Sequence, residues 1–167
     1  MLADIVSKNG NLMLNVPLRR DGTPDEDEVM IVSGIGAWLK VNGEAIYATR
    51  PWKVYGEGPS TTLSEKGRFG GQSDTQKQPF TAQDIRFTQS KDGQTLYAIV
   101  LAFPDDGQVT LKSLAENSAH WDCPVGGVRM LGVRGKLKYT RDGNGLTVTL
   151  PEKRPCDIAF ALKITRR

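Results

Sequence analysis

Acidic side chains are the first residues of this chain whose chemistry needs an explanation. They cluster at Asp25–Glu28 and at Asp105–Asp106, and two more, Glu44 and Glu57, lie in a stretch rich in Gly and Pro. A pair of carboxyl groups can serve as a general acid and a general base. However, Thr-Pro-Asp-Glu is typical of a helix start, and Asp-Asp-Gly is typical of a hairpin turn. We therefore expect structural roles for both clusters, and for Glu44 and Glu57 a structural role with a site role as the alternative.

The remaining reactive residues do not have the pattern of a metal site or a cofactor site. The single histidine, His120, lies near Cys123, and the second cysteine is the distant Cys156. A zinc site needs three or four ligands, so this set falls short, and no glycine cluster ends in the Gly-Lys-Ser/Thr of a phosphate loop. We predict no metal and no cofactor. The two cysteines could pair in a disulfide or remain as buried thiols, and their number does not decide between the two.

Composition excludes several partner classes. The 167 residues are 38% hydrophobic and 25% charged, which is globular, and the formal charge is only +3. Neither half of the chain has the basic excess of a nucleic-acid binder. No apolar stretch approaches the roughly 18 to 20 residues that span a bilayer, and the first residues lack the features of a signal peptide. We expect neither nucleic-acid nor membrane partners, and the sequence itself indicates no compartment.

The first part of the chain has the pattern of an α/β repeat. Residues 1–9 are predicted to be the end of a helix, and Asn11–Val16 is a short apolar run typical of a strand buried on both faces. Thr23 is the expected N-cap of a helix over Glu26–Val41. The apolar stripe expected to pack this helix is Ile31, Val32, Ile35, Trp38 and Leu39.

In the second part of the chain, apolar residues recur at every second position. Residues 43–83 are irregular, and after them short strands alternate with Asp- and Gly-rich turns. The predicted strands are Ile85–Thr88, Thr95–Phe103, Gln108–Lys112, Val128–Gly132, Lys136–Thr140, Gly145–Leu150 and Asp157–Ile164. Strands at this spacing predict an antiparallel β-sandwich. Their aromatic residues alternate in a way that suits its core: Phe87, Tyr97, Phe103, Tyr139 and Phe160.

Several blocks of sequence resemble the α-L-fucosidases, family 29 of the glycoside hydrolases. The blocks of the first part are Asp4–Val16, Asp21–Thr23, Ile35–Leu39, Val41–Tyr47 and Thr49–Trp52. Those of the second part are Phe80–Thr88, Val128–Gly132 and Gly145–Pro151. The first group is similar to the end of the family's catalytic barrel, and the second group is similar to its carboxy-terminal β-sandwich.

The resemblance implies a mixed fold, in which the last β/α unit of a (β/α)8 barrel is followed by an antiparallel β-sandwich. Residues 1–56 would be the end of the barrel, with Asn11–Val16 as its last strand and Glu26–Val41 as its last helix. Residues 57–83 would be a linker or wrapping loop, and residues 84–167 the sandwich. Trp52 would be buried between barrel and sandwich, with a sugar-stacking platform as the alternative.

The resemblance also implies a function, that of a retaining enzyme that removes terminal α-L-fucose from glycans. The family's nucleophile and acid/base lie before the motif that begins at Asp4, so we expect no catalytic residue in this chain and no turnover by it alone. Asn15, at the carboxyl end of the predicted strand, is the one residue expected near the substrate, where it would either contact the sugar or fix the following loop. The expected partners are a fucosylated glycan and either the missing barrel portion or another copy of the chain.

The sequence leaves two other hypotheses about function open. In the first, the sandwich is a carbohydrate-binding module, and in the second it is a structural accessory that stabilises the barrel. A periplasmic or secreted location is suggested by the family resemblance alone.

Overall fold

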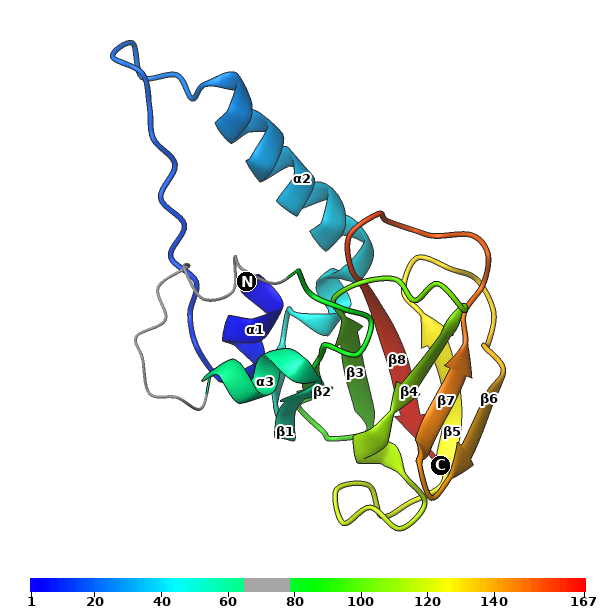
Figure 1. Ribbon diagram of the computed structural model, residues 1–167. Helices are drawn as coiled ribbons and strands as arrows, with labels where there is room; N and C mark the ends of the chain where they lie inside the picture. Colours follow the sequence, from blue (N-terminus) through cyan, green and yellow to red (C-terminus); the bar gives the residue numbers. More distant parts are fainter. Residues whose placement is uncertain (65–78) are drawn as a thin grey trace.

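The computed structural model describes residues 1–64 and 79–167, without the side chains of residues 62–64. No helix in these residues is long and apolar enough to cross a membrane. The elements follow in chain order (Figure 1): α1 (Leu2–Ser7), α2 (Glu26–Asn42), the 3₁₀ turn η1 (Gly43–Ala45), β1 (Thr49–Glu57), α3 (Pro59–Ser64), β2 (Ile85–Ser90), β3 (Thr95–Val100), β4 (Gln108–Leu111), the 3₁₀ turn η2 (Lys112–Leu114), β5 (Val125–Met130), β6 (Tyr139–Asp142), β7 (Gly145–Thr149) and β8 (Phe160–Arg166).

Two antiparallel sheets form a sandwich. The larger sheet has five strands in the order β1-β2-β3-β8-β5, and the smaller has three in the order β4-β7-β6. Strand β8, the last of the chain, lies inside the larger sheet between β3 and β5, and Ala98 on β3 pairs with Phe87 on one side and with Leu162 on the other. The predicted antiparallel sandwich is therefore confirmed.

The core lies between the sheets because their inward-facing positions are apolar. The buried side chains include Phe87, Leu96, Leu162 and Ile164 from the larger sheet and Val109, Leu111, Leu146 and Val148 from the smaller one. Burying a Leu or Phe side chain contributes about 1.5 to 3 kcal/mol each.

Three of the five aromatic side chains follow the prediction. Phe87 and Phe160 are buried in the core and Phe103 is half-buried against it, whereas Tyr97 is buried outside this core and Tyr139 is 36% exposed. The prediction is wrong for Tyr139 because β6 is an edge strand of the smaller sheet, and no residue of β6 is buried.

All seven predicted strands are present, with shifts at their ends. The structure adds a strand that the sequence pattern did not suggest, since β1 pairs with β2 from Thr49↔Ser90 to Glu57↔Ile85. Its register shifts between Pro51 and Gly56, which explains why no regular alternation was visible there. The larger sheet thus begins at Thr49, within the segment expected to belong to the barrel end.

The outer face of the larger sheet is covered by the first part of the chain. A second apolar cluster joins Ala3 of α1 and Ala45 of η1 to Tyr97, Ile99 and Ala161 of the sheet. Strands β2 and β3 are consequently buried on both faces along most of their length. Helix α1 ends as predicted, because Asn9 adopts a left-handed backbone with φ 62° and the Gly10 amide donates to the Ile5 carbonyl at 2.8 Å.

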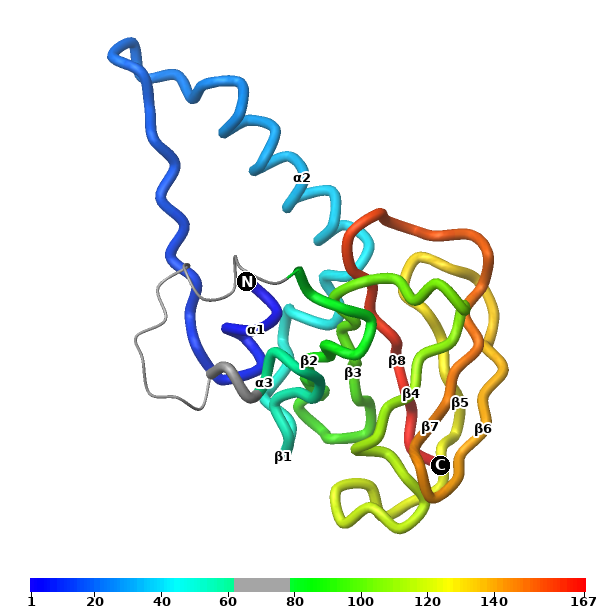
Figure 2. Tube along the Cα trace, viewed as in Figure 1, coloured from blue at the N-terminus to red at the C-terminus, as the bar shows by residue number. Residues whose placement is uncertain are grey.

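The segment Asn11–Val16 differs from the prediction, because it does not form a strand in this structure. No residue from 11 to 16 is assigned to a strand, and Met13 is 95% exposed. A strand exists only through hydrogen bonds to a neighbour, and the described residues supply none for this segment. It runs from α1 to the outer end of α2 as an irregular length of chain (Figure 2).

Helix α2 has the predicted extent, but its cap and its packing differ from prediction. The N-cap is Asp25, whose carboxylate accepts from the Glu28 amide at 3.0 Å, whereas Thr23 bonds to Asp21 instead. Only the carboxyl end of α2 contacts the sandwich, and the rest projects away from it (Figure 1). Ile31 and Val32, predicted to lie in a packed stripe, are 49% and 43% exposed.

Candidate functional site

A buried arginine joins the first part of the chain to the sandwich. The Arg86 side chain on β2 is 2% exposed, and its Nε donates to Asp4 Oδ1 of α1 at 2.5 Å. Its Nη1 donates to the Ile85 carbonyl at 3.0 Å and its Nη2 to Ser60 Oγ of α3 at 2.8 Å. The guanidinium therefore holds α1, β2 and α3 at one point.

Asp4 is the anionic partner in this cluster. Burial alone would raise the pKa of Asp4, but the hydrogen bonds and positive charges of Arg86 and of Lys8, which lies 3.0 Å away, lower it. The carboxylate is thus held ionised as a structural partner.

Asp84, two residues before Arg86 in the sequence, is a buried carboxylate. Only 2% of the residue is exposed. One of its oxygens accepts from the Ser60 amide at 2.7 Å, and the other accepts from the Thr81 amide and hydroxyl at 2.8 and 2.9 Å. Burial alone would raise the pKa of Asp84, but these hydrogen bonds lower it. Asp84 therefore fixes the start of α3 and the approach to β2.

The two single glutamates also have structural partners. Both oxygens of Glu57 accept from the start of η2, through the Lys112 amide at 2.9 Å and the Ser113 amide and hydroxyl at 2.9 and 2.7 Å. Glu44 accepts from Tyr97 at 2.9 Å and from Lys163 at 2.6 Å. Burial opposes ionisation of Glu44, yet its hydrogen bonds from Lys163 and Tyr97 lower its pKa.

The carboxyl end of α2 is anchored by polar contacts. Asn42 is fully buried, and its Oδ1 accepts from the Ala161 amide of β8 at 3.0 Å. The Trp38 indole donates to the Ala159 carbonyl at 2.9 Å. Cys156 is a free thiol that donates to the same carbonyl at 2.7 Å, and burial raises its pKa. Cys123 is free as well.

The residues singled out in the sequence are dispersed. Asn15 is exposed in the irregular segment between α1 and α2. Trp52 is 5% exposed and packs edge-on against Phe87 at 5.0 Å. It is therefore buried as expected, but inside the sandwich rather than between barrel and sandwich. His120 is an exposed loop residue, with its ring 6.2 Å from that of Trp52.

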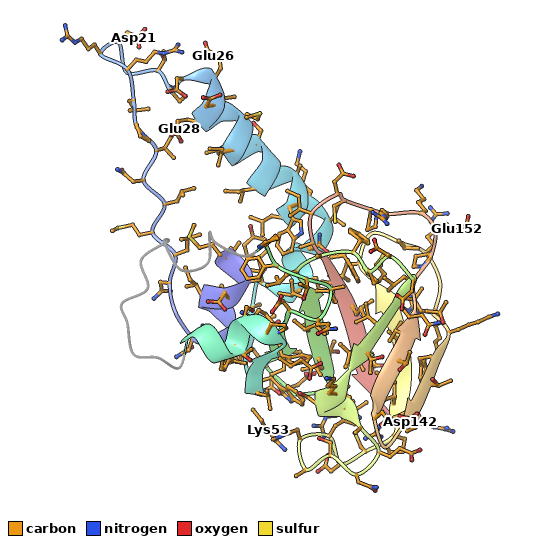
Figure 3. The ribbon with its side chains drawn as sticks, in the orientation of Figure 1. Asp21, Glu26, Glu28, Lys53, Asp142 and Glu152 are labelled. Carbon is orange, nitrogen blue, oxygen red and sulfur yellow. The ribbon has the colours of Figure 1, made fainter. Side chains whose placement is uncertain are left out.

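The acidic cluster at the start of α2 lies at the end of the helix that points away from the sandwich, where Figure 3 labels Asp21, Glu26 and Glu28. Its contacts are local, such as the ion pair of Glu26 with Arg19. Within residues 1–64 and 79–167, no group of three or more His, Cys, Asp or Glu side chains is placed to hold a metal ion.

Sequence reasoning missed Arg86 and Asp84. The signal that could have revealed them is the position of Arg86 between Ile85 and Phe87 in an apolar strand, with Asp84 directly before that strand. Charged side chains are almost never fully buried unless they are paired.

Comparison with known proteins gives the family of this fold. The family described as "Alpha-L-fucosidase C-terminal domain" matches residues 76–165, and the family described as "Alpha-L-fucosidase" matches residues 1–44. The chain belongs to the α-L-fucosidase family. It is similar to the rat tissue alpha-L-fucosidase, with 31% identity over 99% of this chain and 30% of the relative, and to the alpha-L-fucosidase of Branchiostoma floridae, with 33% identity over 98% of this chain and 31% of the relative.

Solved structures agree with this fucosidase assignment. A Thermotoga maritima alpha-fucosidase in complex with a mechanism-based inhibitor aligns with a TM-score of 0.71 and 26% identity, over 98% of this chain and 32% of that chain. An alpha-L-fucosidase isoenzyme from Paenibacillus thiaminolyticus aligns with a TM-score of 0.66 and 22% identity, over 99% and 32% of the two chains, which shows the shared fold. The resemblance found in the sequence is confirmed. The chain spans about 30% of the length of the curated relatives it matches.

Proposed function

We propose that this chain acts as the carboxy-terminal portion of a retaining α-L-fucosidase that hydrolyses terminal α-L-fucose from glycans. The nucleophile and the acid/base would come from polypeptide outside residues 1–167, and the rest of the catalytic barrel would be the partner. The observation that supports this most is an apolar surface on α2 and on the segment before it, beside a sandwich whose core is already closed.

The exposed apolar residues fit a missing barrel. Met13 and Leu18 are 95% and 61% exposed, and Met30 and Ile31 on α2 are 66% and 49% exposed. Soluble monomers rarely expose so many apolar side chains in one region. In a (β/α)8 barrel each strand pairs on both sides and its helix packs over it. With neighbours supplied, Asn11–Val16 would become the last barrel strand.

The carboxyl groups of the chain fit a supporting role. A retaining glycosidase needs a carboxylic acid with a raised pKa as its proton donor. Among the described residues, every carboxyl group with a displaced pKa is shifted downward: Asp4, Asp21, Glu44, Asp84 and Asp92. Asn15 would lie at the carboxyl end of the last barrel strand, so we propose that it lies at the rim of the fucose pocket, where it contacts the sugar or fixes the next loop.

An aryl fucoside assay tests this proposal. The chain is assayed alone, and then mixed with the catalytic barrel of a related α-L-fucosidase truncated before the part equivalent to residues 1–44. We expect no turnover by either polypeptide alone and turnover by the mixture. Turnover by the chain alone would refute the assignment of both carboxylates to outside polypeptide. Light scattering on the chain alone distinguishes a second copy from the barrel as its partner.

A barrel-stabilising role is the second candidate, and the polar anchors described above favour it. Asp4 of α1 is bound to Arg86, and Asn42 of α2 is bound to the Ala161 amide, so both barrel-end helices are fixed to the larger sheet. Disrupting these anchors would lower the stability of the assembled enzyme more than its affinity for substrate.

A further inference from the structure

A groove of about 710 Å³ opens at one end of the sandwich. Gly58 and residues 80–83 form one wall, and residues 102–106 with strand β4 form the other. The chain segments before β2 and between β3 and β4 run close to each other there (Figure 1). The volume falls in the range of about 300 to 1,000 Å³ that small-ligand sites occupy.

The walls and floor of the groove are held rigidly. The Phe103 ring packs on the Phe160 ring with centroids 4.5 Å apart, and Cζ of Arg154 lies 4.5 Å from the centroid of the Phe103 ring. Thr81 is fixed by its two hydrogen bonds to Asp84. Gly58 has φ +106°, and a Cβ there would overlap the Gln83 carbonyl, so the chain is closely packed at this point. A pre-formed groove reduces the entropy that a ligand loses on binding.

The lining offers the chemistry that a sugar requires. Phe80 supplies an apolar surface for the C–H face of a pyranose ring. The exposed Asp105 carboxylate accepts hydrogen bonds, and the exposed Gln108 amide both donates and accepts them, as sugar hydroxyls also do. Glu57 already uses both oxygens to bind the start of η2, so the groove is a binding surface and not a catalytic pair.

The charge of the groove favours neutral glycans over anionic ones. Among the described residues, the carboxylates of Glu57, Asp105 and Asp106 line it together with the cation of Lys112, and the Arg154 guanidinium lies against the Phe103 ring in its wall. The resulting negative field disfavours an anionic ligand and leaves a neutral one unaffected.

We propose that this groove binds a neutral oligosaccharide. Binding at this groove does not require the barrel, and only the choice of a fucosylated probe rests on the proposed function. Failure of glycan binding and failure of turnover in the mixing assay are therefore separate results.

The test is a titration of the ¹⁵N-labelled 167-residue chain with the neutral trisaccharide 2′-fucosyllactose, followed by amide chemical shifts. We expect saturable shifts confined to residues 79–83 and 102–112. The anionic 3′-sialyllactose should bind more weakly. Absence of saturable shifts in the millimolar range, or shifts located elsewhere, would overturn the proposal.

Two variants with matched controls complete the test. Asp105→Ala and Gln108→Ala each remove one hydrogen-bonding group from the groove and should weaken binding by about three- to ten-fold. Asp157→Ala and Gln94→Ala change exposed residues that do not line the groove and should leave affinity unchanged. Equal affinities for all four variants would overturn the proposal. The shift map of the unaltered chain decides the matter if a variant fails to fold.

Discussion

The contribution of the buried Arg86 is best tested by replacing Asp4 with asparagine. This substitution keeps the shape of the side chain and removes the carboxylate that pairs with Arg86 in the described part of the chain. The Arg86 side chain is 2% exposed and that of Asp4 is 28% exposed. Removing one partner of a buried pair costs about 3 to 5 kcal/mol, because the other charge stays buried. Since Asp4 retains some contact with water, we expect the lower end, about 3 kcal/mol of the free energy of unfolding.

Two further variants show whether the cost arises from the unpaired charge. In an Arg86→Met background the buried guanidinium is absent, so Asp4→Asn should then cost about 1 kcal/mol or less. Lys8→Met is the matched control, because Lys8 contacts the same carboxylate at 3.0 Å but its side chain is 33% exposed. An exposed ion pair contributes about 1 kcal/mol at most.

Urea unfolding followed by circular dichroism measures these differences. With a slope of about 2 kcal/mol per molar urea, Asp4→Asn should lower the midpoint by about 1.5 M. A midpoint shift no larger than that of Lys8→Met would refute the reasoning. So would an equal effect of Asp4→Asn in the presence and absence of Arg86.

Three other predictions follow from the same contacts. Asn42→Ala removes the acceptor of the buried Ala161 amide and should lower the free energy of unfolding by about 2 kcal/mol in the same assay; a loss below about 0.5 kcal/mol would contradict that contact. The pKa of Asp84 is lowered in the folded state, so its ionised carboxylate stabilises the fold at pH values above the ordinary carboxyl pKa near 3.9. This stabilisation is lost as the pH falls through the lowered pKa, so the free energy of unfolding should fall from about pH 5 to about pH 2. The substitution Asp84→Asn should make that fall smaller. The chain alone should self-associate through the exposed face of α2, and Met30→Glu should reduce its mass in light scattering while changing stability by less than about 0.5 kcal/mol; an unchanged mass would argue against this face as an interface.

Local sequence patterns predicted most of the sandwich, because a strand that buries one face in a core has apolar residues at every second position. The turns support this reading, since Gly93 and Gly107 have φ of 70° and 68° after Asp, as the Asp-Gly sequences indicate. Strand β1 escaped detection because its register shifts between Pro51 and Gly56. The segment Asn11–Val16 was predicted as a strand from its apolar residues, yet its pairing depends on neighbours that the described chain does not supply.

The sequence alone determined the family, the antiparallel sandwich, the extent of α2 and the left-handed end of α1, because each depends on residues close together in the chain. Only the tertiary structure decided which charges are buried and what they bind. Asp4 and Arg86 are far apart in sequence and meet because α1 covers the outer face of β2. The groove, likewise, exists because segments before β2 and after β3 come together at the end of the sandwich. Contacts of this kind depend on the path of the whole chain, and no local pattern of residues records that path.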